Sequence, residues 1–185
     1  MRVRLRAVTL DDVEWLAAMA TDRDAVGEHN WSGPVDLADQ RRKVVAQVGT
    51  PLDPLRGGLV VELLDGTPIG DVSWRTERWG PHPESACPAI GIALLPDHRG
   101  HGLGTEAQRL LVELLFRLGA HRVQSDTAAD NIAEQRALER AGFGREGVVR
   151  DAEFRDGRRH DHVLYGVIRR EWVRDEALSE HLPAT

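Results

Sequence analysis

Residues 99–104 read Arg-Gly-His-Gly-Leu-Gly, and this glycine-rich stretch decides the fold. An apolar run ends before it near Leu95, and an amphipathic stretch begins after it at Thr105, with Leu110, Leu111, Leu114, Leu115 and Leu118. The order predicts a strand, a loop and a helix. Such a loop binds anions, because glycine lets the backbone approach a phosphate and the first helical turn has free N–H groups.

The composition limits the class of protein. A chain of 185 residues can form one domain with a sizeable core. Cys87 is its only cysteine, which excludes an intrachain disulfide and a cysteine-based zinc site. Thirty acidic residues against 24 Lys and Arg give a net charge of −6, which favours cationic partners over nucleic acid. With no apolar run of membrane-spanning length, we expect a cytoplasmic protein without a membrane partner.

Hydrophobic periodicity predicts a mixed α+β domain. Thr9-Leu-Asp-Asp12 is a capping box that opens a helix, and Asp65-Gly66 and Asp156-Gly157 are hairpin turns. We expect one domain over residues 1–173 and a dispensable C-terminal tail over residues 174–185. The expected elements, in chain order, are a strand at 2–8, a helix from 9 to about 20, a loop at 21–34, a helix at 36–48, strands at 57–64, 67–74 and 89–95, a helix from 105 to 118, a strand at 121–127, a helix at 131–141, and strands at 148–155 and 159–168.

The glycine loop also matches a dinucleotide-binding fingerprint. Gly102-Leu-Gly104-Thr-Glu-Ala107 fits G-x-G-x-x-G/A, and Asp126 follows at the position of a ribose-binding acid. A nicotinamide-dependent oxidoreductase is therefore an alternative. Against it, residues 96–101 separate the strand end from Gly102, whereas the fingerprint begins directly at the strand end. The chain also finishes with one helix and a hairpin, which a doubly wound sheet does not.

Two motifs together resemble a known superfamily. Counted from Arg99, the loop reads Arg-x-x-Gly-x-Gly, and residues 131–143 read Asn-Ile-Ala-Glu-Gln-Arg-Ala-Leu-Glu-Arg-Ala-Gly-Phe. They resemble the motifs Q/R-x-x-G-x-G/A and N-x-x-S-x-x-x-L-E-K-x-G-F of the GNAT acyl-CoA-dependent N-acetyltransferases. Residues 5–12 and 161–172 are similar to the branch that contains the ribosomal-protein alanine N-acetyltransferases (RimJ/RimL-like). The resemblance covers essentially the whole chain.

The resemblance implies a GNAT fold, with a mixed, mostly antiparallel sheet that splays between its fourth and fifth strands and about four flanking helices. It also implies acetyl-CoA as acyl donor. Backbone groups of Ile92 and Leu94 would bind the pantetheine arm, and the loop would bind the pyrophosphate, with Arg99 adding a charge. Asn131 would contact CoA and, with Glu134, also cap a helix. The implied CoA-binding residues are Ile92, Leu94, Arg99, Gly100, His101, Gly102, Leu103, Gly104, Thr105 and Asn131.

The catalytic groups are less well defined. N-acetylation needs a deprotonated amine, a polarised thioester carbonyl and a proton for the departing thiolate. The resemblance assigns the oxyanion contact to the N–H group of Leu94. The family's usual glutamate, tyrosine and serine are replaced here by Ala89, Leu138 and Glu134, so base and acid stay open. The candidates are Asp126, Tyr165 and Glu84, with Ser125 and His82 beside them, and each also fits a surface or packing role.

The acceptor pocket is expected between the loop at 21–34, the segment at 74–85 and the last hairpin. Carboxylates and tryptophan faces bind cations, so the expected acceptor-binding residues are Glu28, Trp31, Trp74 and Trp79. Cys87 fits a small buried residue better than an acyl-carrying nucleophile. His160 and His162 alternate along one strand and fit an exposed face better than a zinc site, and we expect no metal.

These patterns predict an enzyme that transfers the acetyl group of acetyl-CoA to a primary amine by direct attack in a ternary complex. The acceptor is a small cationic metabolite, an amino sugar or a peptide N-terminus, and a homodimer is expected. Because the usual acid and base are missing, a noncatalytic acyl-CoA-binding or interaction module on the same fold is the second alternative.

Overall fold

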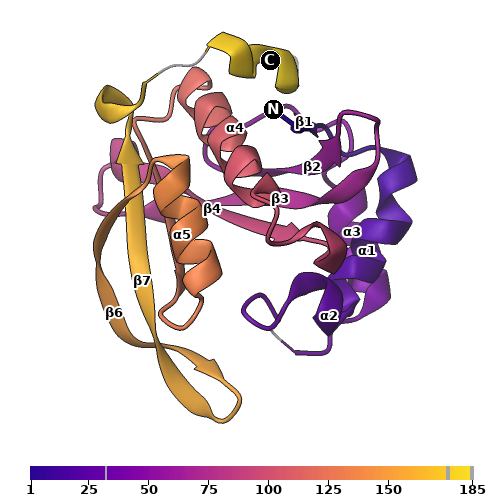
Figure 1. The fold of residues 1–185 in the computed structure, drawn as a ribbon, viewed down its shortest axis with the longest axis horizontal. Coiled ribbons are helices and arrows are strands. Elements are labelled where there is room, and N and C mark those ends of the chain that lie inside the picture. Colours follow the sequence, from indigo (N-terminus) through magenta and orange to yellow (C-terminus); the bar gives the residue numbers. More distant parts are fainter. Residues whose placement is uncertain (32, 174–175, 184–185) are drawn as a thin grey trace.

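The computed structural model describes residues 1–31, 33–173 and 176–183. A seven-stranded sheet with the order β1-β2-β3-β4-β5-β7-β6 forms its centre (Figure 1). Neighbouring strands are antiparallel except for the parallel pair β4 and β5. The strands are β1 (Val3–Arg6), β2 (Gly57–Leu63), β3 (Pro68–Arg78), β4 (Ala86–Leu94), β5 (Arg122–Ala128), β6 (Gly144–Arg155) and β7 (Arg158–Ile168).

Helices cover both faces of the sheet. The α-helices are α1 (Val13–Thr21), α2 (Arg23–Val26), α3 (Leu37–Val45), α4 (Leu103–Arg117) and α5 (Ile132–Ala141). Val60 of β2 packs with Val13, Leu16 and Val44, so α1 and α3 cover one face. Its neighbour Val61 belongs to the main core with the leucines of α4, because successive side chains of a strand point to opposite faces. Helices α4 and α5 therefore cover the other face (Figure 1).

The sheet splits between β4 and β5. These strands share a single bridge, between Ala89 and Gln124, whereas β3 and β4 pair from Gly70–Leu94 to Arg78–Ala86. Just beyond the bridge, the hydroxyl of Ser125 donates to the carbonyl of Ile90 at 3.2 Å. Residues 90–94 of β4 have no ladder partner in β5, so the sheet is split towards the C-terminal ends of these two strands. The expected α+β architecture, splayed between the fourth and fifth strands, is confirmed.

Most expected elements are present, with two differences. The capping box of Thr9 and Asp12 forms, but it opens a 3₁₀ turn, Leu10–Asp12, that continues into α1. The expected loop at 21–34 contains the short helix α2, which Asp22 caps by accepting from the N–H groups of Asp24 and Ala25. The described residues therefore form five α-helices, where about four were expected. No helix within the described residues is long and apolar enough to cross a membrane.

The C-terminal segment packs onto the core. A 3₁₀ segment, Glu176–His181, contacts β1 and α4, and Leu178 is 2 % exposed within the main hydrophobic core. The division into a domain over 1–173 and a tail over 174–185 stays a prediction. The burial of Leu178 nevertheless argues against a dispensable tail, since truncating a buried leucine to alanine costs about 2–5 kcal/mol.

Candidate active site

The loop before α4 presents free backbone donors. Gly100 and Gly102 have φ angles of 77° and 79°, which favour glycine, and Gly102 is the residue before the first turn of α4. Among the described residues, the N–H groups from Gly100 to Thr105 donate no backbone hydrogen bond. A methyl group on Gly104 would lie 3.6 Å from Leu94 and 3.8 Å from Ile92, so the helix start rests directly on the end of β4. This arrangement can bind a pyrophosphate.

The free edge of β4 faces the split. The N–H of Leu95 donates to the carbonyl of Ile69 at 2.8 Å, which makes this a hydrogen-bonded pair of the β3–β4 ladder. Such pairs alternate with non-hydrogen-bonded ones, so the backbone groups of Ile92 and Leu94 point away from β3. This edge can bind an extended chain, and the pantetheine contact that the resemblance implies for Ile92 and Leu94 stays a prediction.

Two of its carbonyl groups are already occupied. The side-chain amide of Asn30, which follows α2, donates to the carbonyl of Ile92 at 3.1 Å. The guanidinium of Arg99 donates to the carbonyl of Leu94 at 2.7 Å and to the carbonyls of Asp24 and Ala25. Arg99 thus fastens the α2 segment to β4 with its side chain. Its expected charge contribution to the pyrophosphate stays a prediction, against which this clamp argues. Its backbone N–H donates to Pro96, so only the later loop donors stay free.

Asn131 caps α5 next to the loop. Its Oδ1 accepts from the N–H of Glu134 at 3.3 Å, which confirms the expected cap, and its Nδ2 donates to the hydroxyl of Thr127 at 3.0 Å. Glu134 accepts a 3.0 Å hydrogen bond from Gln108 of α4. Burial raises the pKa of Glu134 to about 7, against the lowering effect of Gln108. Below about pH 7, Glu134 therefore holds its proton and adds little negative charge near the start of α4.

Three ionisable side chains contact one another in a row on the β5 side of the split. Asp126 lies on β5 two residues past the bridge to β4. Its Oδ2 is 2.7 Å from Nδ1 of His162 on β7, and its Oδ1 is 3.5 Å from Arg75 on β3. Nε2 of His162 is 3.3 Å from Glu153 on β6. Asp126 is therefore the candidate base that the fold brings to the start of the split. His162 and Glu153 join it, although sequence reasoning did not select them.

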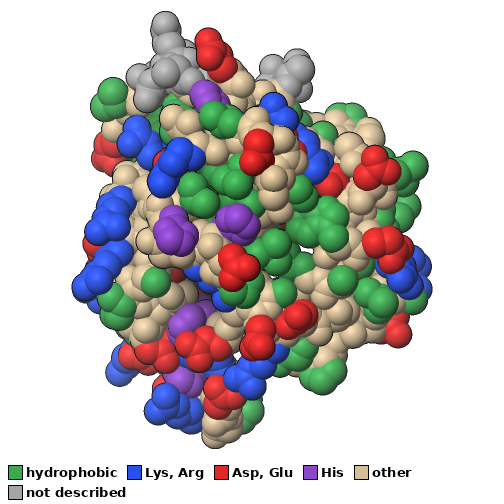
Figure 2. Space-filling view, turned by 45° about the vertical axis from the view of Figure 1, so that its right-hand side comes forward, with side chains coloured by type: hydrophobic (Ala, Val, Ile, Leu, Met, Phe, Trp, Pro, Cys, Tyr) green, Lys and Arg blue, Asp and Glu red, His purple; other side chains and the backbone are tan. Residues whose placement is uncertain are grey.

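A pocket of about 230 Å³ opens beside Asp126 and His162. The indole N–H of Trp79 donates to Gln124 at 2.7 Å, which holds the ring at the pocket although its residue is 62 % exposed. On the face that Figure 2 shows, acidic, basic and histidine side chains lie close together in the lower part. Two carboxylates and an aromatic face suit a cation. The lining includes Glu77, Trp79, Gln124, Asp126, His162 and Leu164.

Ion pairs connect the α2 segment to the β6–β7 hairpin. Asp130 lies 3.7 Å from Nδ1 of His29 and 2.8 Å from Arg155. Arg23 lies 3.7 Å from Asp156 at the hairpin tip. Glu28 is exposed and lies 3.4 Å from Nε2 of His29, so it belongs to this group and remains an acceptor-binding prediction.

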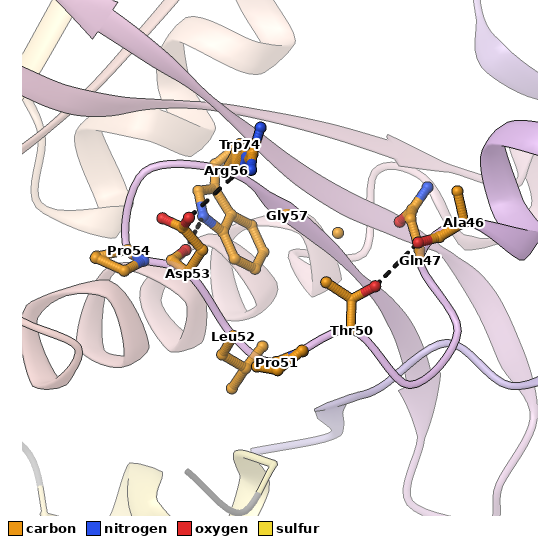
Figure 3. A pocket seen from close by; sticks show the side chains of 11 residues that line it. Ala46, Gln47, Thr50, Pro51, Leu52, Asp53, Pro54, Arg56, Gly57 and Trp74 are labelled. Atoms are coloured by element: carbon orange, nitrogen blue, oxygen red, sulfur yellow. Dashed lines mark hydrogen bonds and ion pairs between the residues drawn. The ribbon is translucent and has the colours of Figure 1, made fainter.

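Two expected site residues are buried away from the split. Tyr165 is fully buried, and its hydroxyl donates to Glu139 at 3.2 Å under α5, while burial raises its pKa. It cannot meet a substrate. Trp74 is 4 % exposed, and its indole donates to the carbonyl of Asp53 at 2.8 Å. It forms the floor of a separate cavity of about 870 Å³ beside the segment at 46–58 (Figure 3). Both expectations are wrong, because each side chain belongs to the core face of its strand.

Other candidates lie outside the pocket. Glu84 and His82 are exposed in the turn before β4, where His82 caps the N–H of Glu84. The structure does not bring them to Asp126. Trp31 is partly buried and stays a prediction. Cys87 is 1 % exposed, and burial raises the pKa of its thiol, which confirms a small buried side chain.

Asp71 is a further carboxylate that sequence reasoning missed. It lies on β3 between Val60 and Ala93, on the same face as Asp126. Burial raises its pKa to about 6. Within the described part of the chain, no three His, Cys, Asp or Glu residues are arranged to hold a metal ion.

Comparison with known proteins identifies the family. The family model described as "Acetyltransferase (GNAT) domain" matches residues 2–144, and the chain therefore belongs to the GNAT acetyltransferase family. This membership, with the antiparallel sheet, removes the dinucleotide-binding alternative.

The similar proteins include several N-acetyltransferases. A putative ribosomal N-acetyltransferase, YdaF, of Bacillus subtilis is 36% identical over 84 residues, covering 45% of this chain and 46% of that protein. An aminoglycoside N(6')-acetyltransferase type 1 of Klebsiella pneumoniae is 45% identical over 100 residues, with 48% of each chain covered. The chain thus spans about half the length of these relatives.

Structure comparison shows the same fold. The spermidine N-acetyltransferase of Vibrio cholerae, solved with CoA and spermine, superposes with a TM-score of 0.76 at 18% identity. The superposition covers 92% of this chain and 97% of that one. The free N–H groups before α4 suit the pyrophosphate of a ligand such as CoA. The open edge of β4 suits its amide-containing arm.

Proposed function

We propose that this protein transfers the acetyl group of acetyl-CoA to a primary amine that is cationic in solution. The observation that carries this proposal is the position of Asp126, a carboxylate in a pocket two residues past the only β4–β5 bridge found in the described chain. Acetyl-CoA supplies the reactive thioester. The chain's own residues bind it, position the amine and handle the protons.

The donor is held by backbone groups. The N–H groups from Gly100 to Thr105 bind the pyrophosphate, and Asn131 lies beside them at the start of α5. The N–H groups of Ile92 and Leu94 face the split, and the N–H of Leu94 serves as the oxyanion donor. For the arm to pair with the carbonyl of Ile92, Asn30 must first leave it.

The acceptor is held by charge. Glu77 and Asp126 attract an ammonium group, and the exposed ring of Trp79 offers it an aromatic face. Glu28 lies two residues before Asn30, which contacts Ile92 at the split, and adds to the negative charge of this segment. The amine then attacks the thioester directly, with both substrates bound. Positioning of the two reactants alone can supply several kcal/mol of the barrier reduction.

Two of the similar proteins are named for amine substrates of this type, an aminoglycoside and spermidine. The net charge of −6 also favours cationic acceptors. Whether the acceptor is a small cationic metabolite, an amino sugar or a peptide N-terminus is decided by the pocket at Asp126 and the segment around Glu28. A cytoplasmic location and a homodimer remain predictions.

The test is release of free thiol from acetyl-CoA in the presence of matched amines. We expect turnover with polyamines, aminoglycosides or peptides with free N-termini, and none with N-acetylated analogues. Asp126→Asn should raise KM for the cationic acceptor at least tenfold while leaving the Kd of CoA unchanged. Tight CoA binding without thiol release across the panel would favour the noncatalytic module instead.

A further inference from the structure

His162 lies at the proposed acceptor pocket without an assigned role. It is on β7, in register with Ala128 of β5 and Val149 of β6. Asp126 is in register with Leu164, two residues further along β7, so Asp126 and His162 share one face of the sheet. The side chain of His162 is 22% exposed and lines the pocket. It is therefore accessible to a ligand there.

Both ring nitrogens of His162 face carboxylates. Nδ1 is 2.7 Å from Oδ2 of Asp126, and Nε2 is 3.3 Å from Oε2 of Glu153. A neutral imidazole donates one hydrogen bond and a protonated one donates two. The shorter contact favours the proton on Nδ1 in the neutral ring, which leaves the lone pair on Nε2. When Nε2 takes up a proton, Glu153 is already in place to accept its hydrogen bond.

We propose that His162 is the general base that deprotonates the acceptor ammonium, with Asp126 orienting the ring and Glu153 stabilising the imidazolium. The inference rests on the proposed function. One ammonium proton passes to Nε2, and the nitrogen lone pair then forms the C–N bond as the C–S bond breaks. The C–S electron pair leaves with sulfur, which takes the second amine proton. Nε2 returns its proton to water, so one proton is released per turnover.

Charged side chains from the neighbouring strands contact Asp126 and Glu153. Arg75 of β3 lies 3.5 Å from Oδ1 of Asp126, and Nε of Arg155 lies 3.3 Å from Oε1 of Glu153. Each carboxylate thus keeps a cationic partner when His162 is replaced, so variants at this position are expected to fold. Other charged residues nearby include Glu77 and Arg78, which line the pocket, and Asp130, which lies 3.5 Å from His160.

The first test compares two histidines on the same face of β7. His162→Gln should lower kcat about 10²–10⁴-fold, the usual contribution of a general base, with KM changed less than threefold. His160→Gln is the control, because His160 lies 3.5 Å from Asp130 and does not line the pocket. It should keep wild-type kcat. Imidazole added to His162→Ala should restore part of the rate, and equal loss in both glutamine variants would overturn the proposal.

The second test needs no substitution. The acid limb of the wild-type pH–kcat profile is measured with two acceptors that share a skeleton but differ in amine basicity. If kcat falls at the same pH with both amines, the titrating group belongs to the enzyme, which supports the proposal. If the pH of the fall shifts with the basicity of the amine, the role of His162 is overturned. Absence of thiol release with every amine would instead contradict the proposed function itself.

Discussion

The side-chain amide of Asn30 donates to the backbone carbonyl of Ile92 at 3.1 Å. This contact joins the segment after α2 to the edge of β4 that faces the split. Asn30 thus makes the same kind of amide-to-carbonyl hydrogen bond that a pantetheine arm would make there. The second donor contact of Asn30, to the carbonyl of Val26 at 3.2 Å, keeps its side chain tied to its own segment.

Asn30→Ala should therefore increase the affinity for CoA. The substitution removes a competing hydrogen bond worth about 0.5–1.5 kcal/mol, so we expect Kd to fall roughly twofold to tenfold. Isothermal titration calorimetry with CoA measures this. Weaker binding by the variant would mean that Asn30 contacts the ligand instead of competing with it.

Replacement of Gly102 tests the anion-binding loop against a matched control. Gly102 and Gly119 have φ angles of 79° and 108°, and Gly119 lies at the far end of α4 with nothing within 4 Å of an added methyl group. Alanine at either position should cost about 1–2 kcal/mol of stability from the left-handed backbone. Only Gly102→Ala should also lower CoA affinity. Equal affinities of the two variants, measured by calorimetry, would remove the loop from the binding site.

Arg99 tests the difference between a clamp and a phosphate ligand. Its guanidinium donates to the carbonyls of Asp24, Ala25 and Leu94. Arg99→Ala should lower the free energy of unfolding by about 2–3 kcal/mol, since hydrogen bonds from a charged donor are lost. Hydrogen exchange over residues 22–31 should become faster, with the Kd of CoA changed less than threefold. A large loss of affinity with unchanged exchange would restore the phosphate role.

Glu134 makes the stability depend on pH. Its pKa is near 4.5 in the unfolded chain and is raised to about 7 by burial in the folded one. Between these values the folded protein holds a proton that the unfolded chain has lost, so stability falls as pH rises through this window. The total is roughly 3 kcal/mol.

Glu134→Gln removes this dependence. Urea unfolding should give similar stabilities for the variant and the wild type near pH 4.5, where the wild-type carboxyl is neutral, and a more stable variant at pH 8. Because all other ionisable groups are the same in the two proteins, the difference in their free energies of unfolding reports on Glu134 alone. An unchanged difference between the two proteins from pH 4.5 to 8 would contradict a neutral, buried Glu134.

The sequence predicted features that depend on local order. The loop at 99–104, the cap by Asn131 and the hairpin turns follow from neighbouring residues, and each is present. Asp126 was a candidate base because it lies on the strand that follows the leucine-rich helix. The sheet split also followed, through the resemblance to a family.

Features that depend on long-range register were missed. Strand periodicity places Tyr165 and Trp74 on one of two faces, but it does not say which face the helices α4 and α5 cover. His162 meets Asp126 only because β7 lies between β5 and β6 and pairs with both. The role of Arg99 as a clamp depends on α2, a helix of four residues that no periodicity signal could reveal.

A crystal structure of the protein with bound CoA tests the central claim most directly. We predict the pyrophosphate at the N–H groups from Gly100 to Thr105, and the pantetheine arm along β4 with Asn30 released from Ile92. The sulfur should lie at the start of the split, within reach of the pocket at Asp126 and His162. CoA bound elsewhere, or a sulfur atom pointing away from that pocket, would contradict the account.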